Sequence, residues 1–216
     1  MTIIAPSLYS ADFANLKKDV ERFNESKAQW LHYDVMDGQF VPNITFGPVV
    51  LKQVNKLTDR FIDVHIMVYN PSRIVDQFDG CRIDMMTFHL EAVNSLEEGY
   101  QVIEKIKSKG YQVGISIKPN TAVEELIPYL DKVDMVLIMS VEPGFGGQKF
   151  NGEVMSKGDW LFDYREEHHL NFLLQVDGGI NKETAVIAKQ HHFNVLVAGS
   201  YCFGNKDFSG AVESIM

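Results

Sequence analysis

Short apolar runs rich in β-branched and aromatic residues alternate with amphipathic stretches along the chain, and this alternation limits the possible folds more than any other feature. Strands that alternate with helices form parallel sheets, and eight such units close an α/β barrel of the (β/α)8 TIM type. We expect strands at residues 3–9, 30–37, 61–68, 85–90, 112–118, 135–141, 172–178 and 195–202. Because no Pro/Ser-rich linker interrupts the pattern, residues 1–216 are interpreted as one domain.

The stretches between these strands carry helical signals of unequal strength. Residues 12–23 place apolar side chains, beginning with Phe13, on one stripe, and residues 97–109 repeat that period. Gly110 is expected to end the second helix. Two glycines weaken the helical prediction for residues 151–169.

Polar residues stand out within strands that should be apolar on both faces. They are Ser7, His32, Asp34, His65, His89, Lys118, Asp177 and Ser200. We expect them in the carboxyl-terminal halves of their strands, at the end of a barrel that carries active sites. This agreement in position indicates an enzyme rather than a purely structural protein.

Composition excludes several other classes of function. The net charge of −9 disfavours nucleic acid as a partner, because a polyphosphate chain would be repelled. No apolar run approaches the roughly 20 residues of a membrane span, and the first residues lack the basic start of a signal peptide, so we expect a cytoplasmic protein. Cys81 and Cys202 match no metal or redox spacing and are interpreted as free, buried thiols.

A metal site is predicted where four of the polar residues converge. The two-residue period of a strand directs His32 and Asp34 to the same side, and His65 and Asp177 follow on two other strands. One divalent ion, Zn²⁺ or alternatively Fe²⁺, Mn²⁺ or Co²⁺, suits such nitrogen and oxygen ligands. A single strand histidine is more often a core residue than a ligand, but three contributing strands reverse that expectation. His89 is expected to support the site or simply to pack.

Two further pairs of histidines are interpreted differently. His168-His169 and His191-His192 occur in helix-like or loop stretches without carboxylates at ligand spacing. We interpret both pairs as solvated surface.

Glycines follow three consecutive predicted strands and indicate a phosphate site. Such glycines let backbone N–H groups approach an anion, and barrels commonly bind phosphate with the loops after strands seven and eight. The residues are Gly144, Phe145, Gly146, Gly147, Gly178, Gly179, Gly199 and Ser200. We therefore expect a small phosphorylated ligand; ordinary turn chemistry is the alternative.

Read together, six segments resemble the ribulose-phosphate 3-epimerase family in its own order. They are residues 5–8, 32–43, 63–68, 87–91, 139–148 and 176–180. The resemblance implies interconversion of D-ribulose 5-phosphate and D-xylulose 5-phosphate in the pentose phosphate pathway, and a homo-oligomer. It also implies that Asp34 and Asp177, besides binding the metal, are the two acid/base groups that move a proton through a metal-stabilised enediolate.

The resemblance assigns further roles to individual residues. Ser7 and His65 match substrate contacts, the glycine segments match the phosphate site, and Met36, Met67 and Met139 match a sulfur-lined patch at the reacting face. For the methionines, ordinary core packing is an equal alternative. Departures from the family pattern, at residues 80–84, 190–193 and the short final helix, bear on stability and oligomer contacts.

Three rival functions use the same residues differently. An allulose-6-phosphate 3-epimerase would need the same machinery, although Gly147 and Gly179 favour the pentose enzyme. A Schiff-base aldolase could use Lys118, which we interpret instead as ion-paired or close to the phosphate. A non-catalytic sugar-phosphate-binding protein would not need both Asp34 and Asp177.

Overall fold

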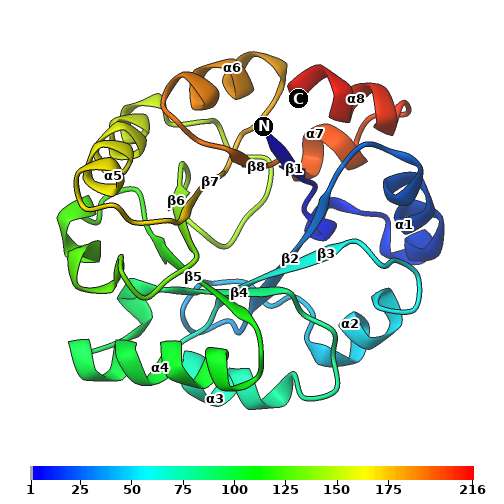
Figure 1. Cartoon of the computed structure of the whole chain (residues 1–216). Coiled ribbons are helices and arrows are strands. Elements are labelled where there is room, and N and C mark those ends of the chain that lie inside the picture. Colours follow the sequence, from blue (N-terminus) through cyan, green and yellow to red (C-terminus); the bar gives the residue numbers. More distant parts are fainter. Residues whose placement is uncertain (1) are drawn as a thin grey trace.

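Eight parallel strands form a barrel in the computed structural model, which describes residues 2–216 (Figure 1). The strands are β1 (Ile3–Ala5), β2 (Trp30–Met36), β3 (Phe61–Met67), β4 (Met85–His89), β5 (Gln112–Ile117), β6 (Met135–Met139), β7 (Leu173–Asp177) and β8 (Val195–Val197). Their order along the sheet is β1-β8-β7-β6-β5-β4-β3-β2. The predicted (β/α)8 barrel is thus confirmed.

The barrel closes between β1 and β2 by a few backbone contacts rather than by a full ladder. Ser7 and His32 form an isolated parallel bridge, and the His32 N–H donates to the Pro6 carbonyl oxygen at 3.1 Å. The Gln29 N–H donates to the Ile4 carbonyl at 3.2 Å. These contacts bring the loop after β1 next to the polar residues of β2.

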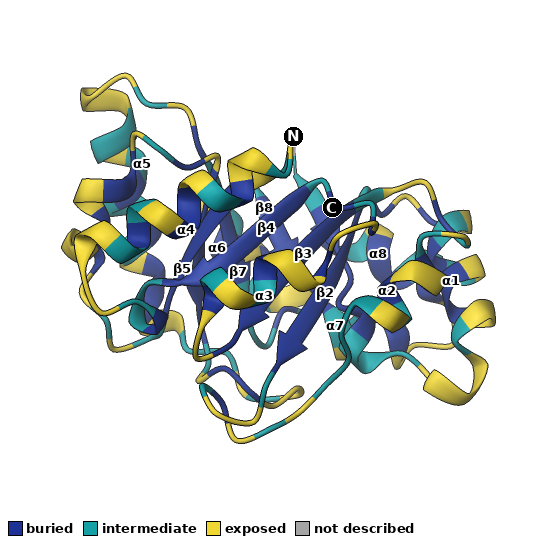
Figure 2. Ribbon diagram, turned by 90° about the horizontal axis from the view of Figure 1, so that it is seen from below, coloured by how far each residue is buried: buried dark blue, intermediate teal, exposed yellow. Residues whose placement is uncertain are grey.

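Helices surround the barrel and cover its outer surface (Figures 1 and 2). They are α1 (Leu16–Glu25), α2 (Pro48–Val54), α3 (Pro71–Gln77), α4 (Leu96–Ser108), α5 (Ser156–Glu167), α6 (Lys182–Gln190), α7 (Gly199–Phe203) and α8 (Phe208–Ile215). In Figure 2 the strands are buried while the helices turn exposed residues outward. Between residues 2 and 216 none of these helices has both the length and the apolar character to cross a membrane.

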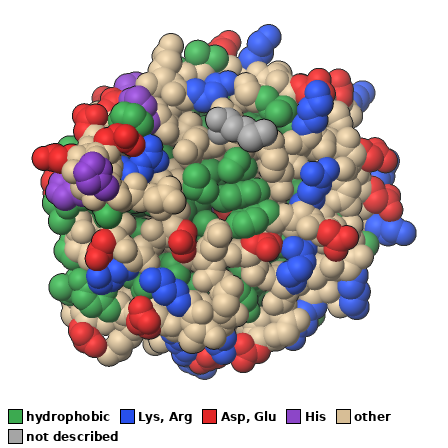
Figure 3. All heavy atoms as spheres, viewed as in Figure 1, with side chains coloured by type: hydrophobic (Ala, Val, Ile, Leu, Met, Phe, Trp, Pro, Cys, Tyr) green, Lys and Arg blue, Asp and Glu red, His purple; other side chains and the backbone are tan. Residues whose placement is uncertain are grey.

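The barrel interior is layered, and the layers decide where chemistry can occur. An apolar plug fills one layer of the interior, and four of its residues, Trp30, Met85, Met135 and Val195, are the first residues of their strands; Ala5 and Val197 complete it. Apolar side chains accordingly gather at the centre of the molecular face in Figure 3, with charged side chains around them. Above the plug the interior is polar, with His32, Asp63 and Gln175 fully buried. Buried polar groups need partners, so this layer must form a network.

The predicted strands at residues 3–9 and 195–202 are too long. After β1 the chain turns into a 3₁₀ helix, Leu8–Ser10, because the Ser7 hydroxyl accepts a hydrogen bond from the Tyr9 N–H. After β8 the helix α7 begins at Gly199, so Ser200 lies in a helix and not at a strand end. The other six strands end within two residues of their predicted ends.

Two predicted positions also differ in detail. His32 is the third of seven residues in β2, so it lies in the first half of its strand and deeper in the barrel than expected. The helix expected over residues 12–23 begins at Leu16, after a 3₁₀ turn over Phe13–Asn15 whose start is capped by Asp12. Phe13 is therefore 45% exposed instead of buried with the apolar stripe.

A helix does form within residues 151–169, where two glycines weakened the helical prediction: a 3₁₀ turn over Gly152–Met155 leads into α5. Gly158 is buried, and a Cβ on it would collide with the His191 carbonyl oxygen and the Phe193 ring. The glycine thus allows α5 to pack closely on the chain before β8. The pair His191-His192, expected as solvated surface, also makes contacts with α5. His191 Nδ1 lies 2.7 Å from the Asp159 carboxylate, and His192 stacks on Phe162.

Replacing Gly158 with Ala should destabilise the protein even though Ala favours helices by about 1 kcal/mol. The collision involves a backbone carbonyl, and overpacking of this kind costs roughly 1–3 kcal/mol. We expect a lower urea midpoint for G158A. The control is Gly152→Ala, because the nearest atom to a Cβ there is a Phe150 ring carbon at 3.9 Å. Equal midpoints for the two variants would contradict the close-packing explanation.

Candidate active site and metal centre

Four side chains from three strands meet in the polar layer of the barrel interior. One ligand atom from each of His32, Asp34, His65 and Asp177 lies within 4.8 Å of the others. His32 and His65 are fully buried, and Asp34 is nearly so. The structure therefore brings together the four residues that the sequence predicted as one metal site.

Strand register explains why these residues meet. His32 and Asp34 are two residues apart on β2 and so point to the same side of the sheet. Asp34 pairs with His65 on the neighbouring β3, while Asp177 ends β7 beside Met139 of β6. The side chains are therefore held by hydrogen-bonded strands rather than by mobile loops.

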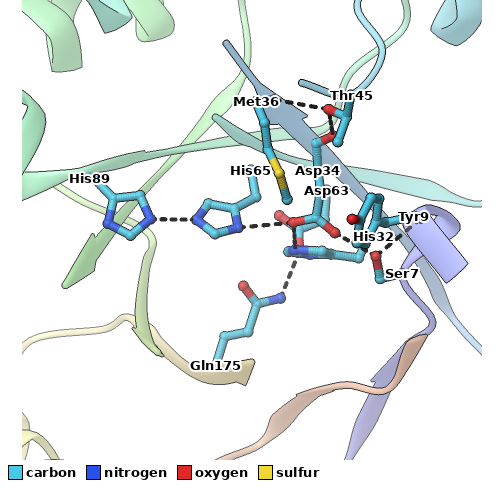
Figure 4. Close-up of polar contacts among 10 residues, drawn as sticks. All are labelled: Ser7, Tyr9, His32, Asp34, Met36, Thr45, Asp63, His65, His89 and Gln175. Carbon is cyan, nitrogen blue, oxygen red and sulfur yellow. Dashed lines mark hydrogen bonds and ion pairs between the residues drawn. The ribbon is translucent and has the colours of Figure 1, made fainter. Parts of the chain in front are cut away.

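The surroundings of His32 fit a cation ligand. His32 Nδ1 lies 2.7 Å from Asp63 Oδ2, which also accepts a hydrogen bond from Gln175 Nε2 at 2.6 Å (Figure 4). With Nδ1 directed at Asp63, Nε2 faces the cluster and lies 3.2 Å from Asp34 Oδ1, yet this buried atom makes no hydrogen bond within the described chain. A ring nitrogen held in this way by a carboxylate is typical of metal-binding histidines.

The charges around His32 favour a cation as well. Burial by itself would lower the pKa of His32, but the negative charges of Asp34 and Asp63 outweigh burial and raise it well above its ordinary value. The same two carboxylates would attract a divalent ion. Two imidazoles and two carboxylates suit zinc, iron, manganese or cobalt.

His65 bridges the cluster to a third histidine. Its Nδ1 lies 3.2 Å from Asp34 Oδ1, and its Nε2 lies 2.9 Å from Nε2 of His89 (Figure 4). His89 thus contacts a member of the cluster without belonging to it.

The two carboxylates of the cluster have opposite proton affinities. Burial favours the neutral form of Asp34, yet the neighbouring His32 and His65 outweigh this effect and lower its pKa far below the usual range. Burial, followed by the negative charge of Asp34, raises the pKa of Asp177 to about 6. Ser7 Oγ donates to Asp34 Oδ2 at 2.5 Å and further stabilises the ionised form. The two carboxylates therefore differ in proton affinity: Asp34 is ionised at neutral pH, whereas Asp177 takes up a proton more readily.

A cavity opens above the carboxylates, and most residues predicted to contact a ligand line it. They are Ser7, Asp34, Met36, Met67, Met139, Gly144, Phe145, Gly146, Gly147, Asp177, Gly178, Gly179, Gly199 and Ser200. His32 and His65 do not line the cavity and lie below it, fully buried. The cavity therefore combines a polar floor, three sulfur atoms and a glycine-rich wall.

The glycine-rich wall depends on backbone conformations that other residues rarely adopt. Gly178 and Gly179 have φ angles of 118° and 61°. A Cβ on Gly179 would lie 2.5 Å from the backbone nitrogen of Phe150, and one on Gly178 would meet Ser140 and Val141. Only glycines let the chain after β7 pass so close to the chain after β6.

Several residues of the site were missed from the sequence. Asp63 supports His32, and the period of β3, which places it on the side of His65, was a usable signal. Gln175 carried the same signal on β7. Asn43 Nδ2 donates to Tyr9 Oη at 2.8 Å and to the Gly144 carbonyl at 3.0 Å, so it ties together the loops after β1, β2 and β6. No local pattern predicted that contact.

Lys118 differs from its prediction. Its ammonium lies 4.2 Å from the centre of the Phe40 ring, and no carboxylate between residues 2 and 216 lies within ion-pair distance. It also does not line the cavity. Lys118 is thus neither ion-paired nor placed at the glycine-rich wall, and the Schiff-base alternative loses its nucleophile.

Solved structures similar to this chain share its fold at low sequence identity. A structure of KGPDC from Streptococcus mutans has a TM-score of 0.70 and 12% identity, over 100% of this chain and 95% of that one. Thiamine phosphate pyrophosphorylase from Pyrococcus furiosus has a TM-score of 0.64 and 13% identity, over 99% and 93%. These likenesses support the barrel architecture alone.

Sequence relatives are much more similar. Ribulose-phosphate 3-epimerase from Schizosaccharomyces pombe is 43% identical over 99% of this chain and 93% of its own length. The enzyme of that name from Bacillus subtilis is 39% identical over 100% and 98%. Residues 3–203 match the pattern of the ribulose-phosphate 3 epimerase family. The chain therefore belongs to the ribulose-phosphate 3-epimerase family.

Proposed function

We propose that this protein interconverts D-ribulose 5-phosphate and D-xylulose 5-phosphate by inverting carbon 3. One observation carries the proposal: two carboxylates from different strands, Asp34 of β2 and Asp177 of β7, share one cluster at the floor of a glycine-walled cavity. Inversion requires a proton to leave one face of a carbon and to return to the other. Two acids beside the same cavity can provide both functions, and family membership supplies the substrate class.

In this mechanism the ionised Asp34 takes the proton from one epimer while the protonated Asp177 delivers a proton to the opposite face. The roles exchange in the reverse direction. Ser7 holds the Asp34 carboxylate in place through its hydroxyl. His32, Asp34, His65 and Asp177 would hold a divalent ion, and such an ion, when bound, supplies positive charge to the enediolate oxygen.

The other cavity residues position the substrate and protect the intermediate. Met36, Met67 and Met139 present side chains that neither donate nor take up protons, so they exclude water from the reacting carbon without competing with the two acids. We assign the substrate phosphate to the backbone of the glycine segments near Gly146, Gly178 and Gly199.

Replacing Asp177 with Asn should lower kcat by roughly 10²–10⁴-fold, because one of the two acid/base groups is lost. Exchange of the carbon 3 proton in deuterated water should continue from the face served by Asp34, without inversion. The control is Asp131→Asn, since Asp131 is exposed and remote from the cavity. Metal content is measured for each protein. Unchanged inversion in D177N would refute the two-acid assignment.

Removing divalent ions with a chelator should abolish turnover, because the four converging ligands include two carboxylates whose charge a divalent ion would neutralise. Adding back zinc, manganese, cobalt or iron(II), one at a time, should restore it and identify the preferred ion. The measurements are activity and bound metal per chain. Full activity in protein that contains no metal would rule out this part of the proposal.

Comparing two substrates tests the pentose assignment. We expect kcat/KM for ribulose 5-phosphate to exceed that for allulose 6-phosphate, because Gly179 packs against the Phe150 backbone and leaves little freedom to widen this wall. A higher value for the hexose phosphate would assign the chain to the alternative activity.

A further inference from the structure

A chain of buried hydrogen bonds leads from the cluster to an acid outside it. His65 Nε2 contacts His89 Nε2 at 2.9 Å, and His89 Nδ1 lies 3.2 Å from Glu91 Oε2. The other oxygen of Glu91, Oε1, accepts the Lys118 N–H at 2.7 Å and also the Thr121 hydroxyl. Glu91 follows β4 and is thereby tied to the loop after β5. None of these residues lines the cavity.

The direction of each hydrogen bond in this series follows from the group at its end, the Glu91 carboxylate. An ionised carboxylate can only accept, so Nδ1 of His89 must donate to Glu91. A neutral His89 then has a free lone pair on Nε2, and it can only accept from His65. His65 must therefore carry its proton on Nε2. Nδ1, which lies 3.2 Å from Asp34 Oδ1, is then the nitrogen left to a divalent ion; without an ion, a proton on Nδ1 can be donated to the Asp34 carboxylate.

The charge states that this scheme needs agree with the surroundings. His89 is fully buried, and burial disfavours the charged form of its ring. Burial would raise the pKa of Glu91, but the hydrogen bond with His89 and other contacts outweigh it and lower the pKa to about 2. The rings of His65 and His89 lie 5.0 Å apart at 30°, so neither can turn without breaking a contact.

We propose that Glu91 and His89 are positioning residues that fix the tautomer of His65, so that Nδ1 and not Nε2 is presented to the divalent ion. The inference rests on the proposed metal-dependent function and deepens it. His32 is oriented by Asp63 directly, whereas His65 is oriented by Glu91 through an intervening imidazole. Side chains in such positions commonly change metal affinity by about 10–100-fold when they are replaced.

Glu91→Gln tests the direction of the hydrogen bonds. Oε1 of Glu91 accepts hydrogen bonds from the Lys118 backbone N–H and the Thr121 hydroxyl. The carbonyl oxygen of Gln should therefore take the place of Oε1. Its NH₂ group would then donate to His89 Nδ1. That reversal puts the His89 proton on Nε2 and forces the His65 proton onto Nδ1, the nitrogen meant for the metal.

The experiment compares wild type, E91Q and E104Q; Glu104 is exposed on α4 and gives the same change of charge. Side-chain ¹⁵N NMR of metal-free protein at about pH 8, above the ordinary imidazole pKa, reports which nitrogen of His65 is protonated. Assignment uses a His65→Asn variant. We expect a proton on Nε2 of His65 in wild type and E104Q, and a proton on Nδ1 alone in E91Q. Titration with Co²⁺ alone should show about 10–100-fold weaker binding for E91Q only.

The outcomes separate this inference from the proposed function. A folded E91Q protein with the wild-type tautomer and wild-type Co²⁺ affinity would overturn the inference. If wild type neither binds Co²⁺ nor turns over substrate, the proposed function fails instead, whatever the tautomer of His65. If E91Q does not fold, His89→Phe replaces it. Because His89→Phe removes the acceptor of the Nε2 proton, the inference requires that Nε2 of His65 loses its proton in part or all of the protein and that Co²⁺ binds more weakly. A fully retained Nε2 proton would overturn the inference.

Discussion

The concentration of charge inside a closed barrel is the constraint on which the rest of the structure depends. Asp34 and Asp63 are buried, Asp177 is half-buried beside them, and such carboxylates are stable only when partnered. Imidazoles provide those partners, and one shared cation would complete the neutralisation. The apolar plug beneath keeps water from entering at the other end of the barrel.

Strands and loops contribute differently to the site. The strands hold the ligand set, because register and the two-residue period fix where each side chain points. The loops supply the cavity wall, and there backbone conformation matters more than side-chain chemistry, as the close approach of Gly179 to Phe150 illustrates. Asn43 joins three of these loops by hydrogen bonds, which hold the glycine-rich wall in position above the carboxylates.

Each imidazole of the cluster is oriented by its own acid. Asp63 acts on His32 directly and is itself held by Gln175, while Glu91 acts on His65 through His89. A neutral imidazole has one donor and one acceptor, so a fixed acid at one end decides which nitrogen faces the metal site. The contacts that hold the two imidazoles thus come from residues that do not line the cavity.

The sequence by itself determined the barrel, the six longer strands, the convergence of His32, Asp34, His65 and Asp177, and the glycine wall, because periodicity and strand polarity are local properties. Only the tertiary structure showed where β1 and β8 end, that Gly158 allows close packing of α5, and that Lys118 contacts Phe40. It also showed which acid lies next to each histidine or is linked to it. These outcomes depend on neighbours from distant segments. Barrel register brings such segments together, and no local pattern in the chain encodes that register.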